Sequence, residues 1–375
     1  MYSPAVAVSN ARPWLLLCKP VRAPFRDGTS VLVRNMLLAM PSEVEVVYFG
    51  DPDAAVRPVG DRVIAATSMA YQPSLANKMK MLAHIATPRM SKLPIHSFFA
   101  PNRGSATALE VVRRFPRSRA VLQTLPASTG CASVANLLAR LDRVVVTSDW
   151  GRNQLLAQGL AEDRVARVYP GVEILAEAPG PAIEQRRSIL FAGDLDEEVG
   201  DRLIDVAASL ADAEEWRLEI ATRPKGEGHE RVKRRLDQEL APAVAAGRVS
   251  FLGEVSSMNE LFDRAALQLY LASHARKKVD IPFVLIEGLA RGVPVAVVDA
   301  APVGELLTLG RKQDLEVGLS LDPKDFRESA REIPALIHDT ARMQRLGRAA
   351  QQLAAERFSA TEMAAAYRQH YEDLS

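Results

Sequence analysis

One carboxylate stands out in the segment "KKVDIPFVLIEGLARGVPVAVVDAAPVGEL", residues 277–306. The apolar run 283–286 ends at Glu287, and a short helical pattern, a Gly-x-Pro break and a second apolar run follow. A carboxylate can accept two hydrogen bonds from a vicinal diol, and a helix N-terminus would stabilise its charge. The backbone N–H groups of Val284 and Leu285 could bind a diphosphate at the same helix start. The alternative is that Glu287 only caps its helix.

Two short acidic patterns could place a metal ion beside a phosphate. They are "DLD" at 194–196 and "DPD" at 51–53. Asp-x-Asp is common by chance and fits turns, so we expect no metal site and no required cofactor. No Walker loop, zinc-ligand spacing or Ser-His-Asp order is found in the sequence.

Strands that alternate with helices must position these residues. Most of the strands are apolar on both faces, which predicts parallel sheets covered by helices. Strands are expected at 14–19, 44–50, 62–67, 94–100, 120–125, 143–148, 164–173, 189–194, 216–222, 249–255, 267–273 and 294–299. Helices are expected at 31–40, 72–94, 132–141, 149–160, 203–211, 229–240, 258–265, 283–292, 325–339, 340–356 and 358–375. Gly28 lies in the turn 25–30, where it is free to adopt a positive φ.

The segment 173–188 interrupts this alternation and is expected to be a linker, because it combines prolines, a glycine and mixed charge. This break divides the chain into two doubly wound domains, 1–172 and 189–357, followed by the final helix at 358–375. Ligands of open α/β sheets bind at the carboxyl ends of strands. If both sheets turn these ends inward, the cleft between the domains is the site.

Composition places the chain among ordinary globular proteins. Its 375 residues are 48% hydrophobic and 25% charged, and the net charge of +1 gives no overall attraction to nucleic acid. Cys18 and Cys131 have no metal or redox spacing and fit a reducing compartment. The apolar run 14–18 is too short for a signal peptide or a membrane span, so we expect a cytoplasmic enzyme or binding protein.

Six segments match, in order, the landmarks of one known family. They are "DGTSVLVRNML" (27–37), "SDWGRNQLLAQGLAEDRVARVYPGVE" (148–173), "ILFAGDLDEEVG" (189–200), "VSFLGEV" (249–255), 277–306 and the C-terminal segment. Within 277–306, Glu287 takes the second Glu of the family's Glu-x7-Glu pattern, "ARGVPV" follows, and Glu305 takes a later Glu. The chain thus resembles the retaining GT-B glycosyltransferases of family four (group 1) over almost its whole length.

This resemblance implies two Rossmann-like domains facing a cleft, with a C-terminal helix that crosses back onto the first domain. It implies transfer of a sugar from a nucleotide sugar, such as a UDP- or GDP-sugar, to a hydroxyl acceptor with retention, as in polysaccharide biosynthesis. Glu287 would bind the ribose hydroxyls. The other donor-side residues would be Gly28, Gly193, Gly253, Val255, Lys278, Asp280, Phe283, Val284, Leu285 and Glu305, and the acceptor-side residues Arg26, His96 and Asn102.

The chain departs from the family pattern at four positions. Val279 replaces the first Glu, for which Asp280 could substitute at the donor sugar. Asp194 and Val199 replace the Arg and Lys that neutralise the diphosphate, and Lys277, Lys278 or Arg26 could supply this charge. Pro126 occupies the place of a His.

His96 could instead face the acceptor, although a lone His after a strand is more often structural. Asn102 and Arg103 share its loop. In the same-face mechanism of this family the donor phosphate accepts the acceptor's proton, so a missing base is tolerable.

Helix 72–94 allows two interpretations. Its lysines and apolar residues could lie on an anionic membrane at the inner face, or the helix packs on the first sheet, which we favour. Two other functions stay open. The losses at 126, 194, 199 and 279 suit a catalytically degenerate protein that binds a sugar or a partner, and an epimerase or nucleotide-binding regulator could use the same fold. The sequence does not indicate the oligomeric state.

Overall fold

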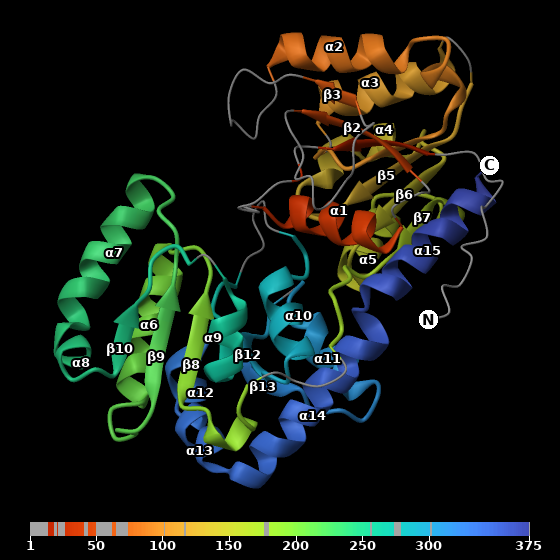
Figure 1. Ribbon diagram of the computed structural model, residues 1–375. Helices are drawn as coiled ribbons and strands as arrows, with labels where there is room; N and C mark the ends of the chain where they lie inside the picture. The colour runs from red at the N-terminus through yellow and green to blue at the C-terminus, as the bar shows by residue number, and fades with distance from the viewer. Residues whose placement is uncertain are drawn as a thin grey trace, which may run out of the picture. The chain divides into compact units, whose positions relative to one another are not determined.

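The computed structural model describes residues 14–18, 21, 27–40, 44–49, 62–64, 74–100, 102–115, 118–175, 180–255, 257–273, 279–300 and 302–374. The chain forms two compact units, 1–171 with 277–279 and 360–375, and 172–276 with 280–359. Figure 1 labels their elements. No helix in the described ranges is long and apolar enough to span a membrane.

The first unit contains a seven-stranded parallel sheet in the order β3-β2-β1-β4-β5-β6-β7. Its strands are β1 (Trp14–Cys18), β2 (Val44–Phe49), β3 (Arg62–Ile64), β4 (Ile95–Ser97), β5 (Val121–Leu125), β6 (Arg143–Val146) and β7 (Val165–Arg167). Its helices are α1 (Gly28–Ala39), α2 (Leu75–Ile85), α3 (Arg103–Arg114), α4 (Ala135–Leu138), α5 (Asp149–Ala157) and α15 (Ala360–Asp373).

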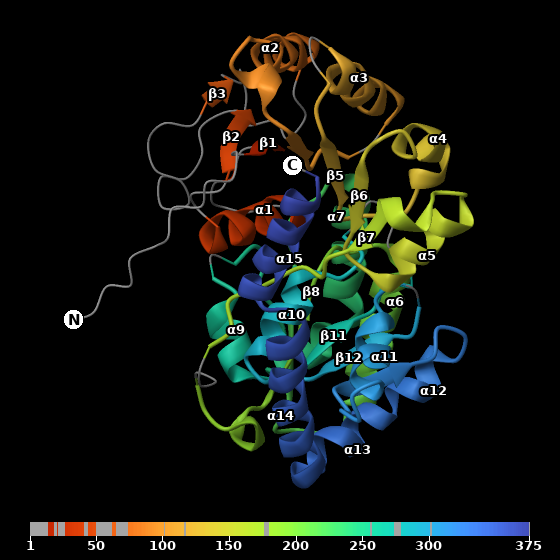
Figure 2. The same cartoon turned by 90° about the vertical axis from the view of Figure 1, so that its right-hand side faces the viewer.

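Alternate residues of β1 face two different helix layers, as the period of a strand requires. Leu15 and Leu17 belong to a core cluster with Met81 of α2 and Leu109 of α3. On the other face, Trp14 stacks on Tyr371 of α15 with the ring centroids 4.5 Å apart. Helix α15 also lies against α1, as Figures 1 and 2 show. The C-terminal helix therefore completes one face of the first sheet.

The second unit repeats this topology with six parallel strands in the order β10-β9-β8-β11-β12-β13. They are β8 (Ser188–Ala192), β9 (Arg217–Ala221), β10 (Val249–Phe251), β11 (Ala265–Tyr270), β12 (Val295–Val298) and β13 (Gly318–Leu321). The helices are α6 (Glu197–Ser209), α7 (Glu227–Glu239), α8 (Ala241–Ala245), α9 (Asn259–Arg264), α10 (Phe283–Ala290), α11 (Glu305–Arg311), α12 (Phe326–Ala330), α13 (Glu332–His338) and α14 (Thr340–Arg357). Helix α6 contacts α7, α12 and α13, α12 also contacts α13, and α10 and α11 pack on α14.

Two parallel α/β sheets were expected and are confirmed, but several elements differ from the sequence expectation. The helix expected at 72–94 ends at Ile85, because Pro88 cannot donate the N–H that would extend it. Its buried residues Met81 and Ile85 pack into the first core, in agreement with the favoured interpretation of this helix. The helix expected at 325–339 is divided at Arg331 into α12 and α13. Pro334 lies in the first turn of α13. The sequence analysis missed α3, α8, α11 and β13.

Candidate functional site

The order of the second sheet reverses between β8 and β11, and a doubly wound sheet binds ligands at such a switch point. The segment 193–196 follows β8 and leads into α6, and the segment 271–282 follows β11 and leads into α10. Most of the predicted donor-side residues therefore lie at one edge of one sheet, since the carboxyl ends of parallel strands share an edge.

Helix α10 begins at Phe283, with Pro282 as its N-cap and no side-chain cap. The N–H of Leu285 already donates to the Pro282 carbonyl at 3.0 Å, and the predicted Leu285 contact to a diphosphate stays a prediction. In the described part of the chain, no acceptor is found for the N–H groups of Phe283 and Val284. These two groups leave the helix start open to an anion.

Glu287 is the fifth residue of α10 and is half-buried. It lies in the second turn, which excludes the alternative that it caps the helix. The expected stabilisation by the helix dipole is also smaller than predicted there, because this effect falls off within the first turn. Asp280 is fully buried just before the helix. Glu305 is half-buried and opens α11 after β12.

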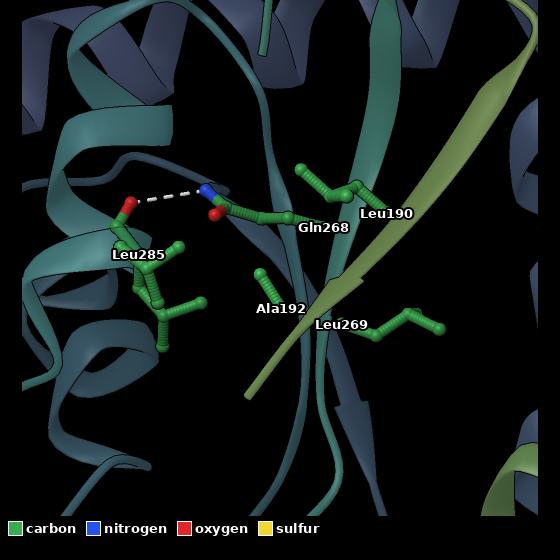
Figure 3. Close-up of a pocket in the computed structure, with 6 residues that line it drawn as sticks. Leu190, Ala192, Gln268, Leu269 and Leu285 are labelled. Carbon is green, nitrogen blue, oxygen red and sulfur yellow. Dashed lines mark hydrogen bonds between the residues drawn. The ribbon is translucent and has the colours of Figure 1, made fainter. Parts of the chain in front are cut away.

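Gln268 of β11 holds α10 against the sheet, as Figure 3 shows. Its amide Nε2 donates to the carbonyls of Leu285 and Val293, each at 3.0 Å, and its buried Oε1 has no partner within the described ranges. A Cβ built on Gly288 would lie 2.4–2.6 Å from this amide. The space between Gln268, Ala192 and Leu285 is too small for a water molecule. The start of α10 is thus fixed by an amide clamp that sequence patterns did not reveal.

The loop after β10, predicted to contact a base, lies in the same region. Gly253 is exposed and adopts a φ of +66°, which favours glycine. Val255 is half-buried and packs on the hydrophobic cluster that also receives Ala192 of β8 and Val284 of α10. Val255, Val284 and the end of β8 before Gly193 thus pack on one cluster, and their roles in donor binding stay predictions.

The acidic side chains after β8 each have a hydrogen-bond or ion-pair partner. Asp194 pairs with Lys225, from the loop after β9, at 2.8 Å. Asp196 is the N-cap of α6 and accepts from the N–H of Val199, whose side chain is buried. Glu198 pairs with Arg202 at 2.9 Å. No cluster of three or more metal-ligating side chains occurs among the residues that the structure describes.

Tyr270 ends β11 at the same edge of the sheet. Its hydroxyl is buried, with no hydrogen-bond partner among the residues that the structure describes. Burial, with Asp194 and Asp196 nearby, raises the pKa of Tyr270 well above its usual value, so the phenol stays protonated. Sequence reasoning missed this residue. Its neutral hydroxyl could donate a hydrogen bond to an anionic ligand.

In the first unit, Gly28 does not have the expected positive φ. It is the first residue of α1, whose N-cap Asp27 accepts from the N–H of Ser30 at 3.0 Å. A Cβ on Gly28 would lie 2.5 Å from Cγ1 of Val279, a residue of the same unit. The glycine is therefore required for space beside Val279.

His96 has the environment of a structural residue rather than of an acceptor-side group. It is fully buried, with Nδ1 2.6 Å from the Tyr371 hydroxyl and Nε2 2.8 Å from that of Thr124. Burial, followed by the charge of His370, lowers its pKa well below the usual value. Asn102 caps α3 by accepting from the N–H of Ser105, in a capping box.

Four other predicted positions lie outside the described residues. They are Arg26, Lys277, Lys278 and the segment 51–53. Their predicted roles stay predictions.

A family match covers the second unit. Residues 186–339 match the family described as "Glycosyl transferases group 1". No curated protein sequence matches the chain.

Solved structures similar to the chain extend over nearly its whole length. Anabaena Alr3699/HepE in complex with UDP and glucose has a TM-score of 0.74 at 16% identity, covering 96% of this chain and 99% of that one. Sucrose-phosphate synthase from Thermosynechococcus elongatus has a TM-score of 0.73 at 18% identity, covering 97% and 99%. A glycosyltransferase from Rickettsia africae has 0.71 at 15%, covering 97% and 99%. The chain therefore has the GT-B fold.

Proposed function

We propose that the chain is a glycosyltransferase that moves a sugar from a nucleotide sugar to a hydroxyl acceptor with retention of configuration. The observation that carries this proposal is the family match over 186–339, which contains the open helix start and Glu287 at the switch point. UDP-glucose is one donor to test first, because the Anabaena protein has been solved with it. The acceptor could be a glycan, a lipid-linked sugar or a small molecule.

Each donor-site residue has a proposed role. Glu287 binds the ribose diol, and the N–H groups of Phe283 and Val284 bind the diphosphate. Asp280 faces the donor sugar, Glu305 supports the phosphate end, and Gly253 and Val255 border the base. Gly28 leaves room near the phosphates, with Arg26 and Lys278 as possible cations. The domains proposed above, 1–172 with 358–375 and 189–357, divide acceptor and donor binding.

The proposed chemistry needs little from the protein beyond positioning. The bond between C1 of the sugar and the phosphate oxygen breaks, and the acceptor oxygen attacks C1 from the same face. The acceptor's proton passes to the departing phosphate oxygen. Electrostatic stabilisation of the leaving diphosphate is then the largest contribution required of the site.

The test is calorimetric titration of the protein with UDP, GDP, ADP and TDP, with and without magnesium, followed by analysis of the product's anomeric configuration. Saturable binding of one diphosphate and a product that retains configuration would support the proposal. If no diphosphate binds, Asp194 and Val199 mark a degenerate scaffold. Epimerised donor without transfer would instead indicate an epimerase.

A further inference from the structure

A lysine from the loop after β9 pairs with Asp194, in the segment where the predicted diphosphate-binding cations are missing. Strands β8 and β9 are adjacent and parallel, with Ala192 opposite Ala221. The N–H of Gly193 donates to the Ala221 carbonyl at 3.2 Å, so the chains leaving both strands begin side by side. Lys225 follows β9 by four residues, and its Nζ lies 2.8 Å from Oδ2 of Asp194.

Lys225 differs from the other cations at this end of α6. Arg202 is buried and donates to the Leu271 carbonyl at 2.6 Å, and Arg231 is engaged by Glu197 at 2.7 Å on the outer surface of α6 and α7. The Lys225 side chain is 58% exposed and that of Asp194 is 23% exposed. An exposed lysine–carboxylate pair contributes little to stability, so the ammonium group can change partner at small cost.

We propose that Lys225 binds the diphosphate of the nucleotide sugar, and that Asp194 holds the lysine over the end of β8 until the diphosphate replaces it. This inference rests on the proposed function and deepens it. The Lys225 ammonium group is a flexible point charge that suits phosphate oxygens. The buried Tyr270 hydroxyl, near Asp194 and without a partner in the described part of the chain, is a neutral donor to the same anion. Lys225, in the loop after β9, thereby supplies positive charge in place of the Arg and Lys that Asp194 and Val199 replace.

The test compares a nucleoside diphosphate with its own nucleoside, using the base that the wild-type protein binds best. Lys225→Ala is expected to weaken diphosphate binding about 10-fold or more, since charge-assisted hydrogen bonds to phosphate are lost. Nucleoside affinity should be unchanged, and Lys225→Arg should retain most of the diphosphate affinity. Lys312→Ala is the matched control, because this exposed lysine ends α11 at the opposite edge of the sheet.

Asp194→Asn is expected to change diphosphate affinity in the opposite direction to Lys225→Ala. Removal of the acid frees Lys225 and removes repulsion, so diphosphate affinity should rise while nucleoside affinity stays the same. Unchanged diphosphate affinity in Lys225→Ala, with intact wild-type binding, would overturn this inference and leave the proposed function standing. Weaker binding in Asp194→Asn would also overturn it, because Asp194 would then contact the ligand directly or through a metal. No diphosphate binding by the wild type would overturn both.

Discussion

The imidazole of His96 bridges the sheet and the C-terminal helix of the first unit. Its Nδ1 lies 2.6 Å from the Tyr371 hydroxyl of α15, and its Nε2 lies 2.8 Å from the Thr124 hydroxyl of β5. Thr124 in turn lies 3.2 Å from the hydroxyl of Tyr367, also on α15. A neutral imidazole suits this position, because one nitrogen donates and the other accepts.

We expect His96→Ala to lower the free energy of unfolding by about 2–4 kcal/mol, since it opens a cavity and leaves buried hydroxyls unpaired. Urea unfolding measured by tryptophan fluorescence would report it, because Trp14 stacks on Tyr371. His338→Ala is the control, at a half-exposed histidine of the second unit. An equal, small loss in both variants would show that His96 does not hold α15.

The lowered pKa of His96 leads us to expect that the first unit loses stability at acidic pH. Its pKa in the fold lies well below the usual 6.5, so the unfolded chain binds the proton more readily. The stability contributed by neutral His96 is present above about pH 6.5 and is lost as pH falls toward the folded pKa. Urea midpoints between pH 7.5 and 5.5 should therefore fall more steeply for the wild type than for His96→Gln. Parallel pH profiles for both proteins would contradict this role.

We expect any side chain at position 288 to lower stability as long as Gln268 is present. Gly288→Ala should lower stability by about 1–3 kcal/mol, because the added Cβ meets the Gln268 amide. Gly228→Ala, in α7, should be neutral or stabilising, because the added Cβ would meet no described atom within 4 Å apart from its chain neighbours and the helix's own backbone. In the double variant with Gln268→Ala the two losses should not add, since the obstructing amide is gone. Additive losses in this cycle would argue against the clamp.

The sequence predicted the order of the strands and helices along the chain better than it predicted which residues lie next to one another in space. Apolar runs and their alternation were sufficient for two parallel sheets, and the helix at 283 was placed where a ligand could meet it. Lys225 was missed because only the adjacency of β8 and β9 brings it to Asp194. Gln268 was missed because a polar residue inside an apolar strand has no sequence pattern of its own.

Other errors came from local geometry that a sequence leaves open. A glycine in a turn-like segment suggested a positive φ at Gly28, whereas α1 already begins there and the need is for space beside Val279. Leu285 was expected to offer its N–H to a diphosphate; in the structure this N–H donates to the carbonyl of Pro282, the N-cap of α10, and the contact stays a prediction. The position of a helix start to within one residue decides which N–H groups remain available.

The most direct test of the donor-site account is a cycle between Glu287 and the ribose hydroxyls. Calorimetry would compare wild type and Glu287→Ala with the best-bound nucleoside diphosphate and with its 2′,3′-dideoxy analogue, with Glu239→Ala of α7 as a surface control. We predict that Glu287→Ala weakens binding of the ribose compound by about 1–3 kcal/mol and leaves the analogue's affinity unchanged. Equal affinity of a folded Glu287→Ala protein and the wild type for the ribose compound would contradict the account.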